Sequence, residues 1–264
     1  MVTSITALSP DACSGLQGIA FDVDDTLTRH GRLEEVAFQA LWRLHEHHIK
    51  LIAVTGRPWG YAHVLAQHWP IDAAVGENGA CWTARLGDAL VEGGLATEDN
   101  RHQDTFRVIQ QRVQASLPHV RVSRDHGLRR YDLAFDVGEY VSLPEADVQR
   151  LVSIIEEGGA QAVRSTVHVH AQLGSWDKAQ GVCDAAKQVL GVDVAAEKSR
   201  WLFIGDSPND AAAFAFFPQS VGVANIQPFL GSLPVPPRYI TQADHGQGFS
   251  ECAQIVLRHR PTKA

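Results

Sequence analysis

The stretch FDVDDTLT, residues 21–28, carries three aspartates within four positions directly behind the apolar run GIAF. Carboxylates this close together repel one another, so they are unfavourable unless a cation or a reaction uses them. A calcium-binding loop is excluded, because its sixth and twelfth positions hold Leu27 and Leu33 instead of glycine and glutamate. The nucleotide-binding patterns GxGxxG and GxxxxGK do not occur. What remains is a carboxylate cluster around a hard divalent cation, with Asp22 free to act as a nucleophile.

Strand and helix patterns alternate at both ends of the chain, which favours parallel βαβ units. Apolar runs at 18–23 and 49–56 predict buried strands, with apolar residues at helical spacing between them. The middle reads instead as helix, two strands, helix, two strands, with the alternation of an antiparallel sheet. We therefore predict an α/β fold, with a doubly wound, Rossmann-like core from residues 1–82 and 173–264. A smaller α+β cap domain, residues 83–172, is inserted into it.

Polar residues follow three of the predicted core strands. Asp22 and Asp24 follow the first strand, and Thr55 and Gly56 follow the second. The segment GDSPND, residues 205–210, begins at the last residue of a third predicted strand, RWLFIG. Open parallel sheets bind ligands beyond the carboxyl ends of their strands, so these segments can converge on one crevice. Each motif taken alone is equally compatible with solvated loop charges or with a helix cap.

The composition limits the class of partner. A formal net charge of -7, a pI near 6.0 and the lack of a basic run disfavour a nucleic-acid surface. No apolar run approaches the roughly 18 to 20 residues of a membrane span, and the first 28 residues lack the basic region of a signal peptide. Four scattered cysteines without a CxxC pair indicate reduced thiols. We expect a cytoplasmic protein whose partner is a small molecule.

Four motifs occur together in a fixed order: DVDDT at 22–26, TGR at 55–57, the lysine of WDK at position 178, and GDSPND at 205–210. In this combination the chain resembles the haloacid dehalogenase superfamily. The insertion between the second and third motifs, with GENGA at 76–80 leading into it, resembles subclass IIB, the Cof-like or sugar-phosphatase-like group. The resemblance covers nearly the whole chain.

The resemblance implies a role for each matching residue. Asp22 corresponds to the nucleophile that forms an aspartyl-phosphate, and Asp24 to the general acid and base. An acid at this second position favours phosphate esters with poor leaving groups. The substrate phosphate is expected to be bound by Thr55, Gly56, Lys178 and Asn209.

The resemblance also implies a Mg²⁺ cofactor. Asp22 and Asp206 correspond to its carboxylate ligands, and Asp24 contributes its backbone carbonyl. Asp210 holds the metal through water or orients Lys178. Oxygen ligands of this kind suit Mg²⁺, which would bridge nucleophile and phosphate and let one anion attack another.

The leading functional hypothesis is a Mg²⁺-dependent phosphatase that hydrolyses a small phosphorylated metabolite, with a sugar phosphate as the first candidate. Two alternatives remain. One is a phosphomutase, because GSWDK at 174–178 resembles the corresponding stretch of phosphomannomutases. The other is a phosphate-ester-binding protein without turnover. The sequence leaves the physiological substrate, the pathway and the oligomeric state open.

Several further residues carry weaker signals. His168 and His170 alternate on one predicted strand face and could point toward the crevice, but two half-exposed strand histidines are the favoured interpretation. Trp59 and Trp176 flank motif residues, where they could stack on a sugar or pack at the hinge between the domains. Arg57 receives no role.

Overall fold

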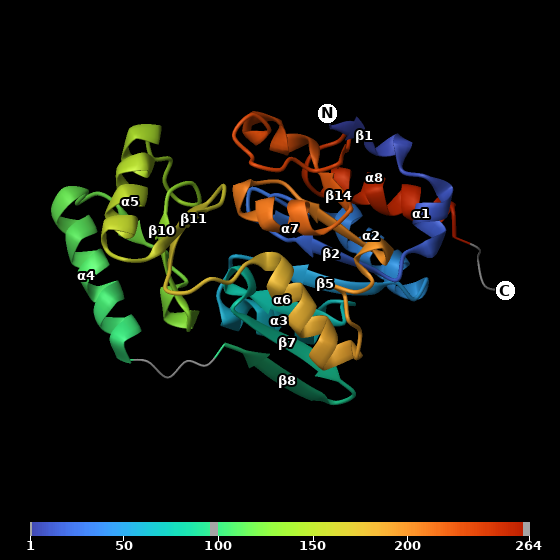
Figure 1. Ribbon diagram of the computed structural model, residues 1–264, viewed down its shortest axis with the longest axis horizontal. Coiled ribbons are helices and arrows are strands. Elements are labelled where there is room, and N and C mark those ends of the chain that lie inside the picture. The colour runs from blue at the N-terminus through green and yellow to red at the C-terminus, as the bar shows by residue number, and fades with distance from the viewer. Residues whose placement is uncertain (1, 96–99, 261–264) are drawn as a thin grey trace.

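The computed structural model describes residues 2–95 and 100–260, which form two bodies of unequal size (Figure 1). Within these residues the larger body is built on a nine-stranded sheet. In spatial order its strands are β1 (Thr3–Ser4), β15 (Tyr239–Ile240), β14 (Gln219–Gly222), β13 (Trp201–Gly205), β2 (Gly18–Asp22), β5 (Lys50–Val54), β6 (Ala73–Gly76), β7 (Cys81–Leu86) and β8 (Ala89–Gly94). The first seven strands in this order run parallel, and β7 pairs antiparallel with both β6 and β8. This is the predicted doubly wound α/β core.

Helices cover both faces of the core sheet. Alternate residues of a strand face opposite sides, and Phe21 belongs to one apolar cluster while Ala20 belongs to the other. The first cluster takes in α1 (Pro10–Gly15), α2 (Glu35–Glu46), α3 (Trp59–His68) and α8 (His245–Arg258). The second takes in α6 (Lys178–Ala185), its π-helical continuation Ala186–Leu190, and α7 (Ala211–Phe216). A short hairpin, β3 (Thr28–Arg29) with β4 (Arg32–Leu33), lies outside the sheet.

The hairpin of β7 and β8 changes one predicted boundary. Residues 83–94 belong to the core sheet, whereas the sequence placed the start of the inserted domain at 83. Gly93 sits directly under the ring of Trp82, because an added Cβ would lie 2.4 Å from the Trp82 Cζ2 atom. We therefore propose that the cap begins after β8 and extends to residue 172.

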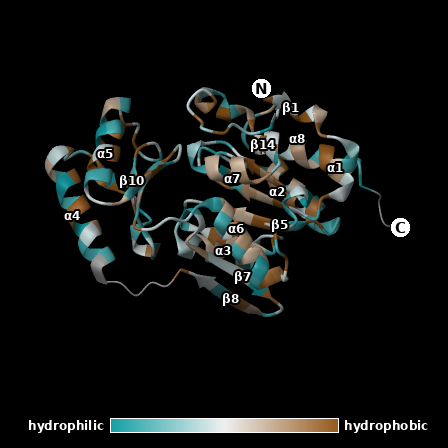
Figure 2. Cartoon of the chain, in the orientation of Figure 1, coloured by the Kyte–Doolittle hydropathy of each residue, from teal (hydrophilic) through white to brown (hydrophobic). Residues whose placement is uncertain are grey.

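The smaller body contains the helix-strand-strand order, twice repeated, that the sequence predicts. It comprises α4 (Asn100–Ser116), β9 (Arg121–Val122), β10 (Asp132–Asp136), α5 (Glu145–Glu157), β11 (Gln161–Arg164) and β12 (His168–Gln172). The strands form an antiparallel sheet in the order β11-β12-β10-β9. The helices lie on the side of this sheet away from the core, and α4 is largely hydrophilic (Figures 1 and 2). The opposite face of the sheet therefore faces the core.

No helix in residues 2–95 and 100–260 is long and apolar enough to span a membrane.

Glu77 links the cap to the core through hydrogen bonds. It lies in the turn Glu77–Gly79 after β6, and its side chain is fully buried. Its two carboxylate oxygens accept hydrogen bonds from four backbone N–H groups at 2.7 to 3.1 Å, namely those of Trp59, Arg130, Tyr131 and Asp132. Three of these donors belong to the cap, so one buried carboxylate orients the start of β10 over the core.

We expect Glu77→Gln to destabilise the protein by about 1 to 3 kcal/mol, the cost of leaving buried polar groups unpaired. The reason is geometric: whichever way the amide is turned, its NH₂ group meets N–H donors and cannot accept their bonds. Thermal unfolding measures the effect. Glu92→Gln is the matched control, because the Glu92 carboxylate is half exposed and its ion pair with Arg130 contributes little. Equal losses in the two variants would contradict this role of Glu77.

Candidate active site

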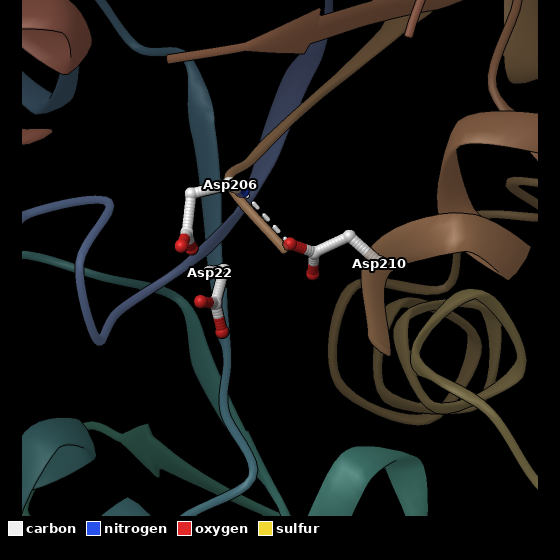
Figure 3. A group of neighbouring side chains, drawn as sticks. All are labelled: Asp22, Asp206 and Asp210. Atoms are coloured by element: carbon white, nitrogen blue, oxygen red, sulfur yellow. Dashed lines mark hydrogen bonds between the residues drawn. The ribbon is translucent and has the colours of Figure 1, made fainter. Parts of the chain in front are cut away.

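Three aspartates meet at the carboxyl end of the core sheet. Asp22 is the last residue of β2, and Asp206 directly follows β13, the parallel neighbour of β2. Asp210 comes from the turn Pro208–Asp210 before α7. One carboxylate oxygen of each residue lies within 4.8 Å of the other two, and Figure 3 shows the three side chains gathered around one space. Residues 184 positions apart in the chain are thus brought to a single site.

The sequence GDSPND shapes this turn. Asp210 Oδ2 accepts hydrogen bonds from the backbone N–H groups of Asp206 and Ser207 at 2.9 and 3.0 Å. Pro208 occupies the first position of the turn, where its missing N–H costs no hydrogen bond. Gly205 is required by space, because an added Cβ would lie 2.4 Å from Asp210 Oδ2. The capping interaction and the clustering of carboxylates therefore coexist in one motif.

Lys178 is the cation of the cluster. It is the first residue of α6 and is fully buried, with Nζ 2.6 Å from Asp22 Oδ1 and 2.7 Å from Asp210 Oδ1. Burial alone would lower the pKa of Lys178, but the carboxylates of Asp210 and Asp22 outweigh it and raise that pKa above its usual value. Lys178 therefore stays charged at neutral pH.

One lysine does not neutralise three buried carboxylates. Burial, which Lys178 only partly offsets, raises the pKa of Asp22 to about 7. Burial and repulsion from Asp22 and Asp210 raise the pKa of Asp206 well above its usual value. The cluster thus lacks positive charge, and a hard divalent cation would supply it. Asp22, Asp206 and Asp210 each offer one oxygen ligand, a donor set that fits Mg²⁺.

Asp24 is held by Arg57, for which the sequence predicts no role. Arg57 Nε lies 3.0 and 3.1 Å from the two Asp24 carboxylate oxygens, and a second guanidinium nitrogen lies 2.8 Å from Oδ1. The Thr55 hydroxyl donates to Asp24 at 3.3 Å. Arg57 also donates to Glu139 of the cap at 2.7 Å. Arg57 therefore positions Asp24 and links it to the cap, a contact that no local sequence signal reveals.

Two polar residues near the carboxylates come from motifs quoted in the sequence but were given no role. The hydroxyl of Thr26, in DVDDT, donates to Asp206 at 2.9 Å. Asn78, in GENGA, adopts a left-handed backbone conformation with φ of 57°, which asparagine tolerates better than most residues. Asn209 donates its side-chain amide to Asn78 Oδ1 at 3.1 Å. Their position inside recognised motifs is the only sequence signal for these contacts.

A small cavity of about 10 Å³ lies between the cluster and the cap. Its core-side lining includes Asp22, Asp24, Gly56, Ser207 and Asn209. Thr55 is buried just behind Gly56. Asp22, Asp24, Gly56 and Asn209 thus line one cavity, whereas Lys178 contacts Asp22 and lines a neighbouring cleft. The individual roles of these residues stay predictions.

The cap closes this cavity with both histidines of β12. His168 and His170 are buried and line the cavity, so the prediction of half-exposed histidines is wrong. The reason is that the polar face of the cap sheet faces the core instead of solvent. His168 Nε2 lies 3.0 Å from Glu139 Oε2, and His170 Nδ1 lies 2.8 Å from Asp132 Oδ2.

A sequence model of haloacid dehalogenase-like hydrolases matches residues 19–103, the segment that contains the first two motifs and the entry to the cap. About a third of the chain therefore matches the haloacid dehalogenase-like hydrolases, in agreement with the resemblance carried by the four motifs. Comparison with curated protein sequences finds no significant match.

Solved structures share the fold of this hydrolase over nearly its whole length. The Thermoplasma acidophilum protein 0175 superposes with a TM-score of 0.70 at 17% identity, over 92% of this chain and 98% of that one. The sucrose-phosphatase of Synechocystis, in complex with sucrose and phosphate, has a TM-score of 0.60 at 20% identity, over 91% and 98%. A subclass IIB sugar phosphatase has a TM-score of 0.58 at 15% identity, over 90% and 98%. At these identities the similarity is one of fold, and it confirms a Rossmann-like core with an inserted cap.

Proposed function

We propose that this hydrolase is a Mg²⁺-dependent phosphatase that acts on a small phosphorylated metabolite through an aspartyl-phosphate on Asp22. One observation carries the proposal. Asp22 is a buried carboxylate with Lys178 at 2.6 Å and the Asp206 and Asp210 carboxylates around it, and it lines the small cavity under the cap. Such a site neutralises an attacking carboxylate and an incoming phosphate together.

The first step joins Asp22 to phosphorus. An Asp22 carboxylate oxygen forms a bond to the phosphorus atom as the bond from phosphorus to the leaving oxygen breaks. Asp24, in its protonated form, gives its proton to that leaving oxygen. In this proposal Lys178, the Gly56 backbone N–H and the Asn209 amide bind the phosphoryl oxygens.

The second step releases phosphate. Asp24, now ionised, takes a proton from a water molecule whose oxygen attacks phosphorus, and the bond from phosphorus to Asp22 breaks. Asp22 and Asp206 would hold Mg²⁺ with the Asp24 backbone carbonyl, and Asp210 would support it. When bound, the metal ion neutralises charge on the phosphate and fixes its orientation.

A sugar phosphate is the first substrate candidate. The similar structures include the Synechocystis sucrose-phosphatase, a subclass IIB sugar phosphatase and the C-terminal domain of the Candida albicans trehalose-6-phosphate phosphatase, which has a TM-score of 0.70 at 12% identity over 97% of both chains. Their names support the class of substrate for this chain and do not identify the sugar.

Release of inorganic phosphate from a panel of sugar phosphates tests the proposal. We expect release with Mg²⁺ and none after chelation with EDTA. Conversion of one sugar phosphate into its positional isomer without free phosphate would instead favour the phosphomutase. Tight binding of a sugar phosphate without either reaction would favour the phosphate-ester-binding protein that does not turn over its ligand.

The carboxylate cluster also predicts how stability responds to metal. We expect Mg²⁺ to raise the melting temperature of the wild-type protein, because it binds the folded cluster and relieves its repulsion. Asp206→Asn keeps an acceptor for Thr26 but removes one charge, so it should abolish the Mg²⁺-dependent rise and melt higher than wild type in EDTA. Thermal unfolding with and without Mg²⁺ checks both. A full Mg²⁺ response in Asp206→Asn would contradict the proposed ligand.

A further inference from the structure

Strand β12 presents a polar face to the catalytic core. Val169 and Ala171 pack into the apolar core of the cap, so the alternate residues His168, His170 and Gln172 face the other way. All three are buried, with about 1% of their surface exposed. A buried polar face is unfavourable unless each group has a hydrogen-bond partner.

Several atoms on this side have no such partner. Neither the amide nitrogen nor the carbonyl oxygen of the Gln172 side chain has a partner among the described residues, and the same holds for His170 Nε2 and Asn78 Nδ2. These groups offer donors and acceptors of neutral character. Buried donors and acceptors without a hydrogen-bond partner in a native site indicate that a ligand or water binds there.

The state of His170 follows from its surroundings. Burial lowers the pKa of His170 to about 4, so its ring is neutral at pH 7. Nδ1 lies 2.8 Å from the carboxylate of Asp132, whose pKa the neighbouring Arg129 and His170 hold low against burial. The ring proton therefore sits on Nδ1, and Nε2 is a free acceptor toward Gly56 and the catalytic cavity.

Gln172 lines a second, larger cleft beside the catalytic cavity. This cleft, of about 370 Å³, lies between the cap strands and the helices α6 and α7. Asn78, Lys178 and Trp176 line it as well, and Asn209 lines both spaces. A phosphate held at Lys178 and Asn209 would leave the rest of the ester within this cleft.

The charges around the cleft disfavour a second anion. Lys178 is already paired with Asp22 and Asp210, and Arg164 is paired with Glu145 through two hydrogen bonds of 2.7 and 2.8 Å. These are the two cations in the described lining; Lys178 is assigned to the transferred phosphate, and Arg164 already has a carboxylate partner. The available groups in this cleft are the side-chain amides of Asn78 and Gln172 and the Trp176 ring, which suit hydroxyl groups and a sugar face.

We propose that Gln172, with His170 beside it on β12, is the specificity-determining residue that hydrogen-bonds the hydroxyl groups of a neutral, polyhydroxylated leaving group. This inference rests on the proposed phosphatase function and narrows its substrate class. The Gln172 amide supplies one donor and one acceptor to neighbouring hydroxyls, and His170 Nε2 accepts from a hydroxyl nearer the phosphate.

The test measures kcat/KM for three esters with Mg²⁺: a hexose 6-phosphate, phenyl phosphate and 3-phosphoglycerate. Gln172→Met keeps the length of the side chain and removes both hydrogen-bonding ends. We expect it to lower the ratio of kcat/KM for the hexose phosphate to that for phenyl phosphate by about 10- to 100-fold. This ratio does not depend on the fraction of folded protein. Gln149→Met, exposed on α5, is the matched control and should leave the ratio unchanged.

Two results would overturn the inference. One is an unchanged ratio in Gln172→Met, and the other is a wild-type enzyme that prefers 3-phosphoglycerate to the hexose phosphate. If wild type hydrolyses none of the three esters, the phosphatase proposal fails instead. Calorimetric binding of the hexose 6-phosphate then decides the inference: weaker binding to Gln172→Met than to wild type supports it, and equal binding overturns it.

Discussion

Asp22→Asn is expected to lower the rate of phosphate release by at least about 10⁴-fold, the scale seen when a catalytic nucleophile is removed. Asparagine has nearly the same shape, and its carbonyl oxygen can still accept the hydrogen bond that Lys178 Nζ gives to Asp22 Oδ1. Its amide does not attack phosphorus at a useful rate. The loss should therefore appear in kcat, while binding of the phosphate ester persists.

The same variant separates catalysis from folding. Burial raises the pKa of Asp22 to about 7, so removal of this charge should not destabilise the protein at pH 8 in EDTA. We expect a melting temperature equal to or above that of wild type. Asp88→Asn, in the exposed turn between β7 and β8, is the control for the substitution itself. Undiminished phosphate release from Asp22→Asn would refute the aspartyl-phosphate pathway.

The core and its strand-end residues follow from the sequence for a physical reason. Strands buried on both faces read as continuous apolar runs, and their carboxyl ends meet at one edge of a parallel sheet. Asp22, Thr55 and Asp206 could therefore be placed near one another before any coordinates were known. Lys178 required the family motif, since helix α6 could begin with many residues.

The contacts between the cap and the core could not be predicted in this way. Arg57 reaches Glu139, 82 positions away, only because the cap docks over the second core strand. The alternation in VHVHAQ correctly predicts a two-faced strand, but it does not tell whether the polar face meets water or another polar surface. The half-exposed interpretation of His170 was wrong and Gln172 was not singled out, because that choice depends on the docking of the two domains.

Lys178→Met should remove both stability and activity. The methionine side chain has similar length and no charge, so the Asp22 and Asp210 carboxylates lose hydrogen bonds of 2.6 and 2.7 Å and their buried counter-charge. Breaking a buried ion pair by removing one partner costs about 3 to 5 kcal/mol. Loss of a preorganised group that stabilises transition-state charge lowers kcat by about 10²- to 10³-fold.

The destabilisation should grow with pH. Lys178 lowers the pKa of Asp22 against the effect of burial, so its removal raises that pKa further above the unfolded value. A carboxyl with a raised pKa in the folded state binds more protons there than in the unfolded state, and stability then falls as pH rises through the folded pKa. Denaturant unfolding in EDTA should therefore show a larger loss of unfolding free energy at pH 8 than at pH 5.

Lys187→Met is the control, because Lys187 is exposed in the π-helical continuation of α6. It should change stability by less than about 0.5 kcal/mol. Equal losses of stability at the two pH values would show that Lys178 acts through packing. That result would contradict its role as the counter-charge of Asp22.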